Sequence, residues 1–359
     1  MQGSHGSAYG LKYQARSIAA QVADTENTRW LVGTLSLRED NEVHLIQLAD
    51  NSADILCEGL YTHQNEIWDL AACPFDSQFF STVYAQGGDF GAAIWRIPER
   101  GQGGNRVIPL QNVVNLQGHT HKIKCTLWWP SGKHNQLVSI DAENLYLWDI
   151  DTSLKTAQVH GFASAGELSH MASGCWDPHD VNHVATATDV SVQCWDLRSM
   201  NQTNKIEQAH MLQVRHLDFN PKKQHIMITA GDDSRIRIWD LKMPNIPLQE
   251  LPGHQHWAYR VQYNPKYEEL VLSSGTDSRV NLWHVALALS GDAKPRSPFG
   301  SPKGPSDSLL RAYTEQEDSV YGLAWSTRDP WVFASVSYDG RVMVDSVPQS
   351  VRKQLTSRR

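Results

Sequence analysis

Short apolar segments alternate with polar turns along most of this chain, most regularly over residues 209–241. Three segments there, 213–219, 225–230 and 235–239, are rich in β-branched and aromatic residues. Asn-Pro, Gly-Asp and Asp-Ser pairs, which favour turns, separate them. Runs of this length and composition predict short β-strands joined by tight turns.

The same pattern repeats with a fixed period. His210 and Trp239 lie 29 residues apart, and so do His254 and Trp283. Trp195, Trp239 and Trp283 follow one another at intervals of 44 residues. A period of about 40 to 45 residues that begins near Gly-His and ends near Trp-Asp is typical of a four-stranded propeller blade. We therefore predict an all-β fold, a β-propeller that forms a single domain.

Seven blades would account for nearly all of the 359 residues. We place the openings of the innermost strands at Tyr9, Ile67, Ile123, Leu168, Val214, Ala258 and Val320. Residues 1–8 are expected to form a flexible lead-in, residues 9–356 the propeller and residues 357–359 a tail. Closing the ring removes exposed sheet edges. Either the N-terminus or residues 348–356 can supply the closing strand, and the C-terminal segment is favoured here.

One insertion breaks the period. Residues 286–308 are rich in Gly, Ser and Pro and poor in apolar side chains, so we predict a disordered inserted loop. Ser297-Pro298 and Ser301-Pro302 within it are candidate phosphorylation sites. A linker without a function of its own is the favoured interpretation of such a composition.

A set of four residues recurs in two consecutive blades, in the order His, Ser or Thr, Asp and Trp. The members are His210, Thr229, Asp233 and Trp239, followed by His254, Ser273, Asp277 and Trp283. Buried polar groups need hydrogen-bond partners, so we expect each set to form one bonded chain, a structural tetrad. The set also resembles a catalytic triad, but an enzyme seldom needs several identical nucleophiles, and the structural interpretation is favoured.

Other blades depart from this pattern. Asp141 stands seven residues before Trp148 instead of six, and Glu167 lies roughly where the fourth blade should have its His. The final blade has Gln316 in place of the His and Asp345 in place of the Trp. The third and fourth blades are therefore expected to have weak tetrads and to be less rigid.

One position per blade, just after the blade begins, is expected to lie at the top face beside the channel. Across the copies it holds Trp68, Lys124, Arg215, Tyr259 and Tyr321, with Trp257 nearby. Aromatic residues and Arg are typical of protein-binding hot spots, which favours a partner-binding surface. The alternative is that some of these side chains simply pack between blades.

The overall composition narrows the functional classes. The formal net charge of −7 and a pI near 6.1 provide no electrostatic footprint for nucleic acid. Five scattered cysteines indicate reduced thiols in the cytosol or nucleus. The repeat already explains the first His of the pairs His119/His121 and His254/His256, so no metal or cofactor is expected. No apolar run is long enough to cross a bilayer, and any membrane association is expected to come through a partner.

The His…Trp-Asp copies resemble the WD-repeat family over nearly the whole chain. Four stretches resemble, more narrowly, the EARP-interacting protein family: HQNEIWDLAACP (63–74), HWAYRVQYNP (256–265), GTDSRV (275–280) and EDSVYGLAWSTRDPWVFASVSYDGRV (317–342). The resemblance implies a non-enzymatic propeller without a small-molecule substrate. It also implies binding to the EARP and GARP tethering complexes in endosomal recycling and retrograde traffic. Such a protein would be cytoplasmic and recruited to the endosome and trans-Golgi network through its partners.

A second functional class is suggested by Trp195-Asp196-Leu197-Arg198. This WD-x-R sequence resembles the motif through which some WD-repeat proteins dock onto the adaptor of cullin-4 ubiquitin ligases as substrate receptors. Arg198 would offer a planar, charged fork to an acidic surface. Lys242 takes the same place one blade later. Both partner classes stay open at this point.

Overall fold

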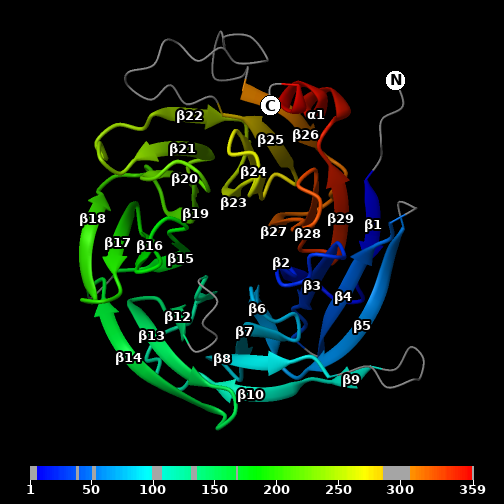
Figure 1. Cartoon of the computed structure of the whole chain (residues 1–359), viewed down its shortest axis with the longest axis vertical. Coiled ribbons are helices and arrows are strands. Elements are labelled where there is room, and N and C mark those ends of the chain that lie inside the picture. The colour runs from blue at the N-terminus through cyan, green and yellow to red at the C-terminus, as the bar shows by residue number, and fades with distance from the viewer. Residues whose placement is uncertain are drawn as a thin grey trace.

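The chain forms a ring of seven blades around a central channel (Figure 1). The computed structural model describes residues 6–37, 40–50, 54–98, 107–130, 136–166, 169–285 and 308–357. Each blade in this part of the chain is one sheet of four strands, except the first, which has five. The predicted all-β, seven-bladed propeller in a single domain is therefore confirmed.

The first three blades are built from the N-terminal part of the chain. Blade 1 contains β2 (Ala15–Ala20), β3 (Arg29–Thr34), β4 (Asn41–Leu48), β5 (Ile55–His63) and β9 (Ile108–Pro109). Blade 2 contains β6 (Glu66–Ala72), β7 (Phe79–Gln86), β8 (Asp89–Arg96) and β10 (Gln111–Asn115). Blade 3 contains β11 (Cys125–Trp128), β12 (Gln136–Ile140), β13 (Asn144–Asp151) and β14 (Thr156–Ser164). The strands pair antiparallel except β9, which pairs parallel with β5.

The remaining blades follow in chain order. Blade 4 contains β15 (Met171–Trp176), β16 (His183–Thr188), β17 (Ser191–Asp196) and β18 (Asn201–Ile206). Blade 5 contains β19 (Val214–Phe219), β20 (Ile226–Gly231), β21 (Arg235–Asp240) and β22 (Gln249–Pro252). Blade 6 contains β23 (Ala258–Tyr263), β24 (Leu270–Gly275), β25 (Val280–His284) and β26 (Leu309–Tyr313). Blade 7 contains β27 (Val320–Trp325), β28 (Val332–Ser337), β29 (Arg341–Ser346) and β1 (Ser7–Gly10).

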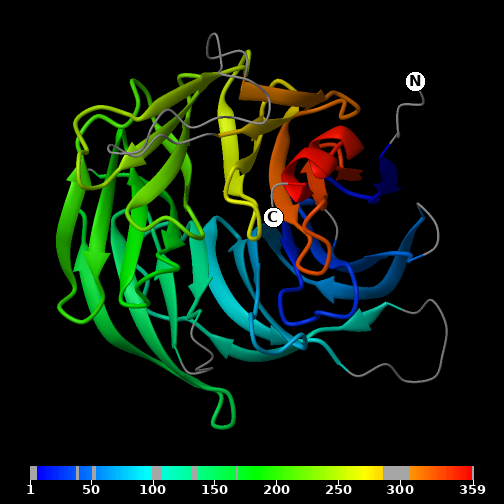
Figure 2. The same ribbon diagram turned by 45° about the horizontal axis from the view of Figure 1, so that its top comes forward.

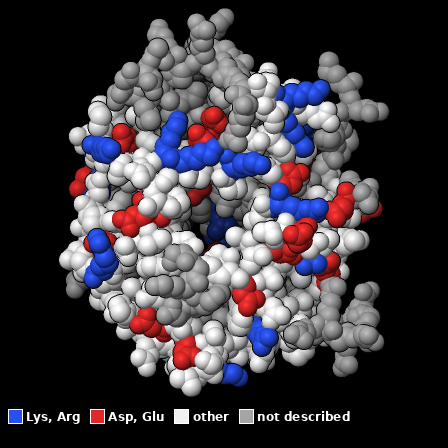
Figure 3. Space-filling model, viewed as in Figure 1, with Lys and Arg blue, Asp and Glu red and all other residues white. Residues whose placement is uncertain are grey.

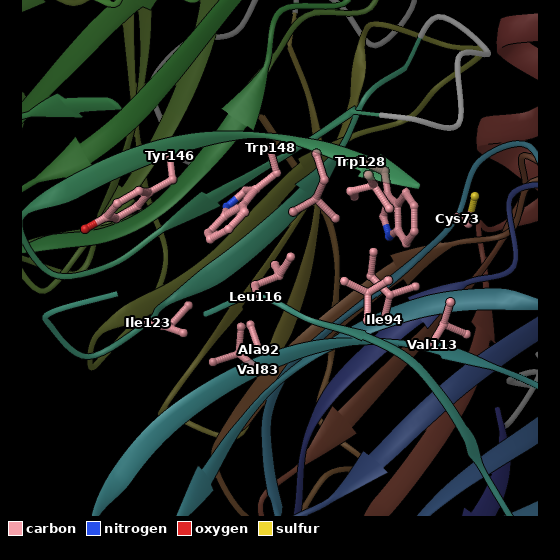
Figure 4. Packing of buried hydrophobic residues seen from close by; sticks show 13 residues of the cluster. Cys73, Val83, Ala92, Ile94, Val113, Leu116, Ile123, Trp128, Tyr146 and Trp148 are labelled. Atoms are coloured by element: carbon pink, nitrogen blue, oxygen red, sulfur yellow. The ribbon is translucent and has the colours of Figure 1, made fainter. Parts of the chain in front are cut away.

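The hydrophobic core lies between neighbouring blades. Seven clusters of buried side chains are found among the described residues, one at each junction around the ring. Figure 4 shows the junction between blades 2 and 3, where Ile94 and Val113 of one blade face Trp128 and Trp148 of the other. Both faces of a blade are thus covered, which explains why second strands such as β20 are buried along their whole length.

The ring closes through the N-terminus. β1 pairs antiparallel with β29, so that Ser7 lies opposite Val344 and Gly10 opposite Arg341 (Figures 1 and 2). The expectation that residues 348–356 supply the closing strand is therefore wrong, and Ser7 and Ala8 belong to a strand instead of a flexible lead-in. Residues 1–5 lie outside the described part of the chain.

This closure changes where blade 1 begins. Its innermost strand, β2, starts at Ala15, so the predicted opening at Tyr9 is wrong. Tyr9 belongs instead to the closing strand β1, where its side chain packs against the hydrophobic core between blades 7 and 1. The Trp30 indole of blade 1 also donates to the carbonyl oxygen of Ala324 in blade 7, at 3.3 Å. The predicted opening at Leu168 lies outside the described residues, and β15 begins at Met171.

The C-terminal segment forms the helix α1 (Gln349–Thr356). Val351 and Leu355 are one helical turn apart, and both are buried against the core between blades 6 and 7. In the described part of the chain, no helix has the length and apolar character needed to cross a membrane. The five cysteines are all free.

Candidate functional site

The innermost strands of all seven blades begin at one mouth of the central channel. A cavity of about 230 Å³ lies there, and every blade contributes to its lining. We call it the channel-mouth cavity. Figure 3 shows Lys or Arg atoms inside the central hollow. Five residues from the predicted partner-binding set line this cavity: Trp68, Lys124, Arg215, Tyr259 and Tyr321.

Arg16 of β2 lies at the centre of an aromatic cage in this cavity. Its guanidinium carbon lies 4.9 Å from the ring centroid of Trp68, 5.2 Å from that of Tyr259 and 4.8 Å from that of Tyr321. It also donates a hydrogen bond to the Tyr259 hydroxyl. Three aromatic walls fix the guanidinium in place through cation–π attraction. Sequence reasoning missed Arg16 because it started blade 1 at Tyr9, which put Arg16 out of register with the other copies.

Two lysines of blade 3 complete the positive side of the cavity. The Lys122 ammonium lies 4.4 Å from the Trp68 ring and 4.1 Å from the Phe90 ring. Burial, together with the nearby positive charge of Arg16, lowers the pKa of Lys122. Burial also lowers the pKa of Lys124, assisted by the charges of Lys122 and Arg215. The cavity therefore holds cations in an environment that disfavours their charge.

The sixth predicted residue of the top face, Trp257, lies beside the cavity. The Arg215 guanidinium is 5.2 Å from its ring and forms a two-bond ion pair with Asp232, with both distances at 2.6 Å. Trp257 is 41% exposed, which is unusual for so large an apolar side chain. The structure thus groups all six top-face residues in one region, and their role in partner binding remains a prediction.

Arg198, by contrast, lies on the opposite face. Strands of one blade alternate in direction, so the turn after the third strand is at the bottom when the first strand begins at the top. Arg198 follows β17, the third strand of blade 4, and its side chain is 67% exposed. Asp196 accepts bonds from the backbone N–H, Nε and Nη2 of Arg198 at 3.0, 3.1 and 3.1 Å. These bonds hold the Arg198 guanidinium in one orientation at the bottom face of blade 4.

The structure assembles the tetrad of blade 5 into one hydrogen-bonded chain. His210 Nδ1–H donates to Asp233 at 2.7 Å, while the Thr229 hydroxyl bonds His210 Nε2 at 2.8 Å and accepts from the Trp239 indole at 3.0 Å. Burial lowers the pKa of His210, so the ring is neutral and Nε2 can accept. Burial alone would raise the pKa of Asp233, but the hydrogen bond from His210, the backbone N–H of Met211 and the charge of Arg237 hold this pKa well below its usual range.

Blade 6 repeats the arrangement. His254 Nδ1 bonds Asp277 at 3.0 Å, and the Ser273 hydroxyl bonds His254 Nε2 at 2.8 Å and accepts from the Trp283 indole at 2.8 Å. A β-carbon on Gly275 would lie 2.6 Å from His254 Nδ1, so the ring needs a glycine there. The Ser273 hydroxyl belongs to a fully buried residue whose bonds are already used, which leaves no access for a substrate.

Blade 3 has a complete tetrad, against the expectation that it would be weak. His119 contacts Asp141 at 3.3 Å and Ser139 at 2.8 Å, and Trp148 donates to Ser139 at 2.6 Å. The hairpin between its second and third strands is one residue shorter than in blade 5, because Ile140 pairs with Leu145 where Ala230 pairs with Ile236. Asp141 reaches the His from this shorter turn.

The described residues of blade 4 include the Trp end of the hydrogen-bonded chain, where the Trp195 indole donates to Thr186 at 3.0 Å. Glu167, expected near the position of the missing His, lies outside the described residues, as do Ser297, Ser301 and residues 286–307 of the predicted insertion. Ser308, the last residue of that range, is buried and accepts a hydrogen bond from Gln249 at 3.0 Å.

Blade 7 replaces the His by an amide. Gln316 Nε2 donates to the Ser335 hydroxyl at 3.0 Å, and its Oε1 accepts from Ser337 at 2.9 Å. Asp339 also lies within hydrogen-bonding reach of the Ser337 hydroxyl, so the single proton of this hydroxyl is shared between two acceptors. An amide has both donor and acceptor atoms, so it can link two hydroxyls as a neutral imidazole does.

Asp345, which takes the place of the Trp in blade 7, is buried, and we therefore expect the stability of the protein to depend on its protonation. Burial raises its pKa to about 7, with help from Glu315 and against Arg311. Because the unfolded chain releases this proton near pH 4, the folded state loses relative stability as the pH rises from about 4 to 7. Asp345→Asn should therefore increase the free energy of unfolding by about 2–4 kcal/mol at pH 8 and leave it nearly unchanged at pH 4.

Urea unfolding of both proteins at the two pH values measures this difference. Glu207→Gln, at an exposed carboxylate, is the matched control and should show no such dependence. An equal difference at pH 4 and pH 8 would contradict a titrating Asp345.

The two His pairs that could suggest metal binding are otherwise engaged. His119 bonds Asp141 and Ser139, and His256 Nδ1 lies 2.5 Å from the Thr276 hydroxyl. In the described part of the chain, no group of His, Cys, Asp and Glu residues could hold a metal ion.

The amino-acid sequence of this propeller matches two known family models. Residues 3–283 match the family model described as EIPR1 beta-propeller, and residues 307–344 match the WD domain, G-beta repeat. The chain belongs to the EIPR1 β-propeller family. This family of WD-repeat propellers is generally non-catalytic, which agrees with the buried hydroxyls of the tetrads.

Members of the family resemble the chain over nearly its full length. WD repeat-containing protein DWA2 of Arabidopsis thaliana is 52% identical over 345 residues, covering 96% of this chain and 97% of the relative. The EARP-interacting protein homolog of Dictyostelium discoideum is 40% identical, covering 95% and 94%. EARP and GARP complex-interacting protein 1 of Homo sapiens is 36% identical, covering 96% and 97%.

Proposed function

We propose that this EIPR1-family propeller is a docking platform that binds the adaptor of a cullin-4 ubiquitin ligase through Arg198 and acts as a substrate receptor. The observation that carries the proposal is the exposed, fixed guanidinium in Trp195-Asp196-Leu197-Arg198. Asp196 holds Nε and Nη2, and no hydrogen bond from Nη1 to a described residue is found, so its two donors are available to a partner. A group already held in position loses less conformational entropy when it binds.

The comparison with relatives supports this choice. The plant protein with 52% identity is named only for its WD repeats, whereas the relatives named for EARP are 34–40% identical. In sequence identity, the chain is therefore more similar to a relative whose name mentions no tethering complex than to the relatives named for EARP. This difference supports the adaptor-docking interpretation of the WD-x-R sequence over the tethering function.

Replacing Arg198 by Ala should weaken binding of the purified adaptor at least tenfold, because a charged hydrogen-bonding group contributes about 1.5–3 kcal/mol. Isothermal titration calorimetry with adaptor and propeller measures the effect. Lys242→Ala is the matched control, since Lys242 is exposed at the same place in blade 5. Unchanged adaptor affinity in Arg198→Ala, or equal loss in both variants, would sink the proposal.

A second candidate function is supported by the names of other relatives. Proteins called EARP and GARP complex-interacting protein 1 match 96% of this chain. On this alternative the chain binds tethering-complex subunits in the cytoplasm and is recruited to the endosome and trans-Golgi network, with the channel mouth as the contact surface. Affinity capture of the Arg198→Ala variant separates the two candidates. Recovery of tether subunits without adaptor from the unaltered chain would place the tethering function first.

A further inference from the structure

We propose that the channel-mouth cavity recognises a phosphorylated serine or threonine on a partner peptide, with an apolar residue of that peptide on the neighbouring surface. This site is on the face opposite Arg198 and does not depend on which complex the rim of blade 4 binds. It would give the platform a partner surface controlled by phosphorylation.

The cavity carries an excess of positive charge, although the formal net charge of the protein is −7. Five cations from four different blades line the cavity: Arg16, Lys122, Lys124, Arg215 and Arg260. Two of them have carboxylate partners, since Arg215 pairs with Asp232 at 2.6 Å and Arg260 lies 3.5 Å from Asp69. The other three form no ion pair with a carboxylate of the described residues.

These three cations lie close together without a direct ion pair to a described carboxylate, although Asp69 lines the same cavity and Glu66 acts on Lys122 from a distance. Arg16 and Lys122 are placed by contacts with aromatic rings, and burial together with the neighbouring positive charges lowers the pKa of both Lys122 and Lys124. Like charges that share a partly buried site repel one another. A bound anion would relieve this repulsion and favour the charged form of both lysines.

A phosphate monoester suits this group of cations better than a carboxylate does. A phosphate monoester carries a charge of about −1.5 to −2 and three strong acceptor oxygens, so it can bridge several cations at once, whereas a carboxylate carries a single charge. The cavity volume of about 230 Å³ leaves room for such a group. Among the described residues, none bonds the buried Nδ1 of His216, which also belongs to the lining of the cavity. This atom leaves hydrogen-bonding capacity unused beside the cavity.

The apolar surface beside the cavity favours a peptide ligand over a free inositol phosphate. Trp257, which contacts Arg215 at the edge of the cavity, is 41% exposed. Met211 and Leu212, in the loop that leads to the lining residue Gln213, are 83% and 53% exposed. Apolar side chains at this density beside a charged hollow are a surface for an apolar side chain of a partner. A small soluble phosphate would leave them unused.

The test uses the full chain and an immobilised peptide library with phosphoserine or phosphothreonine at the centre and randomised flanking positions. Binding is compared with the same library carrying unmodified Ser and Thr, and with inositol hexakisphosphate. The phosphorylated library should be retained at least tenfold more strongly, with selected peptides enriched in apolar residues near the phosphate. The double variant Lys122→Met and Lys124→Met, which keeps most of each aliphatic stem, should reduce binding at least tenfold.

Lys242→Met makes the same chemical change on the opposite face and should bind as the unaltered chain does. Circular dichroism and thermal unfolding check that the double variant folds, and each single Lys→Met variant serves if it does not. Equal retention of both libraries, or equal loss with Lys242→Met, would overturn the proposal. Binding of inositol hexakisphosphate with no retained phosphopeptide would overturn the assignment to a peptide.

Discussion

A chain that begins at Leu11 is expected to unfold about 8 °C below the full-length protein. It lacks β1, whose four residues pair with β29 and whose Tyr9 packs on the core between blades 7 and 1. Hydrogen bonds contribute about 1 kcal/mol each, so the loss of this ladder should remove ~4 kcal/mol from the free energy of unfolding. For a domain of this size, 1 kcal/mol corresponds to about 2 °C in the unfolding midpoint.

The same deletion should promote self-association, because β29 becomes an unpaired sheet edge that can template pairing with another chain. Differential scanning calorimetry and light scattering measure the two effects. A chain that begins at Gly6 retains all of β1 and is the control. If both shortened chains unfold at the same temperature and stay monomeric, β1 does not close the ring in solution.

Thr229→Val is the substitution inside a blade with the largest expected cost. It preserves the side-chain volume but removes the hydroxyl that bonds both His210 and Trp239. Two buried polar groups are left without a partner, and each costs about 1–3 kcal/mol. The free energy of unfolding should therefore fall by about 2–6 kcal/mol, measured by urea denaturation.

Thr327→Val makes the same change at an exposed threonine and should alter the stability by less than about 0.5 kcal/mol. His210→Ala should likewise lower the unfolding temperature by a few degrees, since Thr229 and Asp233 then lose a shared partner. A Thr229→Val protein as stable as the Thr327→Val protein would show that the tetrad does not stabilise blade 5.

The number of blades was predictable because the repeat is carried by residues with a strong local cause. Trp195, Trp239 and Trp283 each lie one residue before the end of a third strand and donate an indole N–H to a hydroxyl on the second. The spacing between residues gave a wrong prediction of the tetrad where the length of a turn differs between blades. In blade 3, a hairpin shorter by one residue places Asp141 beside His119, although the count from Trp148 is off by one.

The ends of the chain were not predictable from local patterns. Tyr9 and the segment containing Val351 and Leu355 both carry apolar residues suited to the last blade. Only the packing of the whole ring decides that the first forms the strand and the second a helix. Blade 1 has no His…Trp signature to fix its register. Arg16 could therefore not be predicted as a residue of the top face.

The position of the top-face residues as a group was predictable because each lies within two residues of the start of an innermost strand. The same register places Trp68, Tyr259 and Tyr321 at one cavity. The sequence could not show that their rings converge on Arg16, since that depends on side-chain directions across three blades. It also could not show which cations lack a carboxylate partner.

The pairing of β1 with β29 also constrains how the protein is made. The earliest described strand to leave the ribosome waits for more than three hundred further residues before its hydrogen-bonding partner exists. At translation rates of about 5–20 residues per second, this interval lasts roughly 15 to 70 s. Until then the ladder between β1 and β29 cannot form, and the ring cannot close before the last blade has been synthesised.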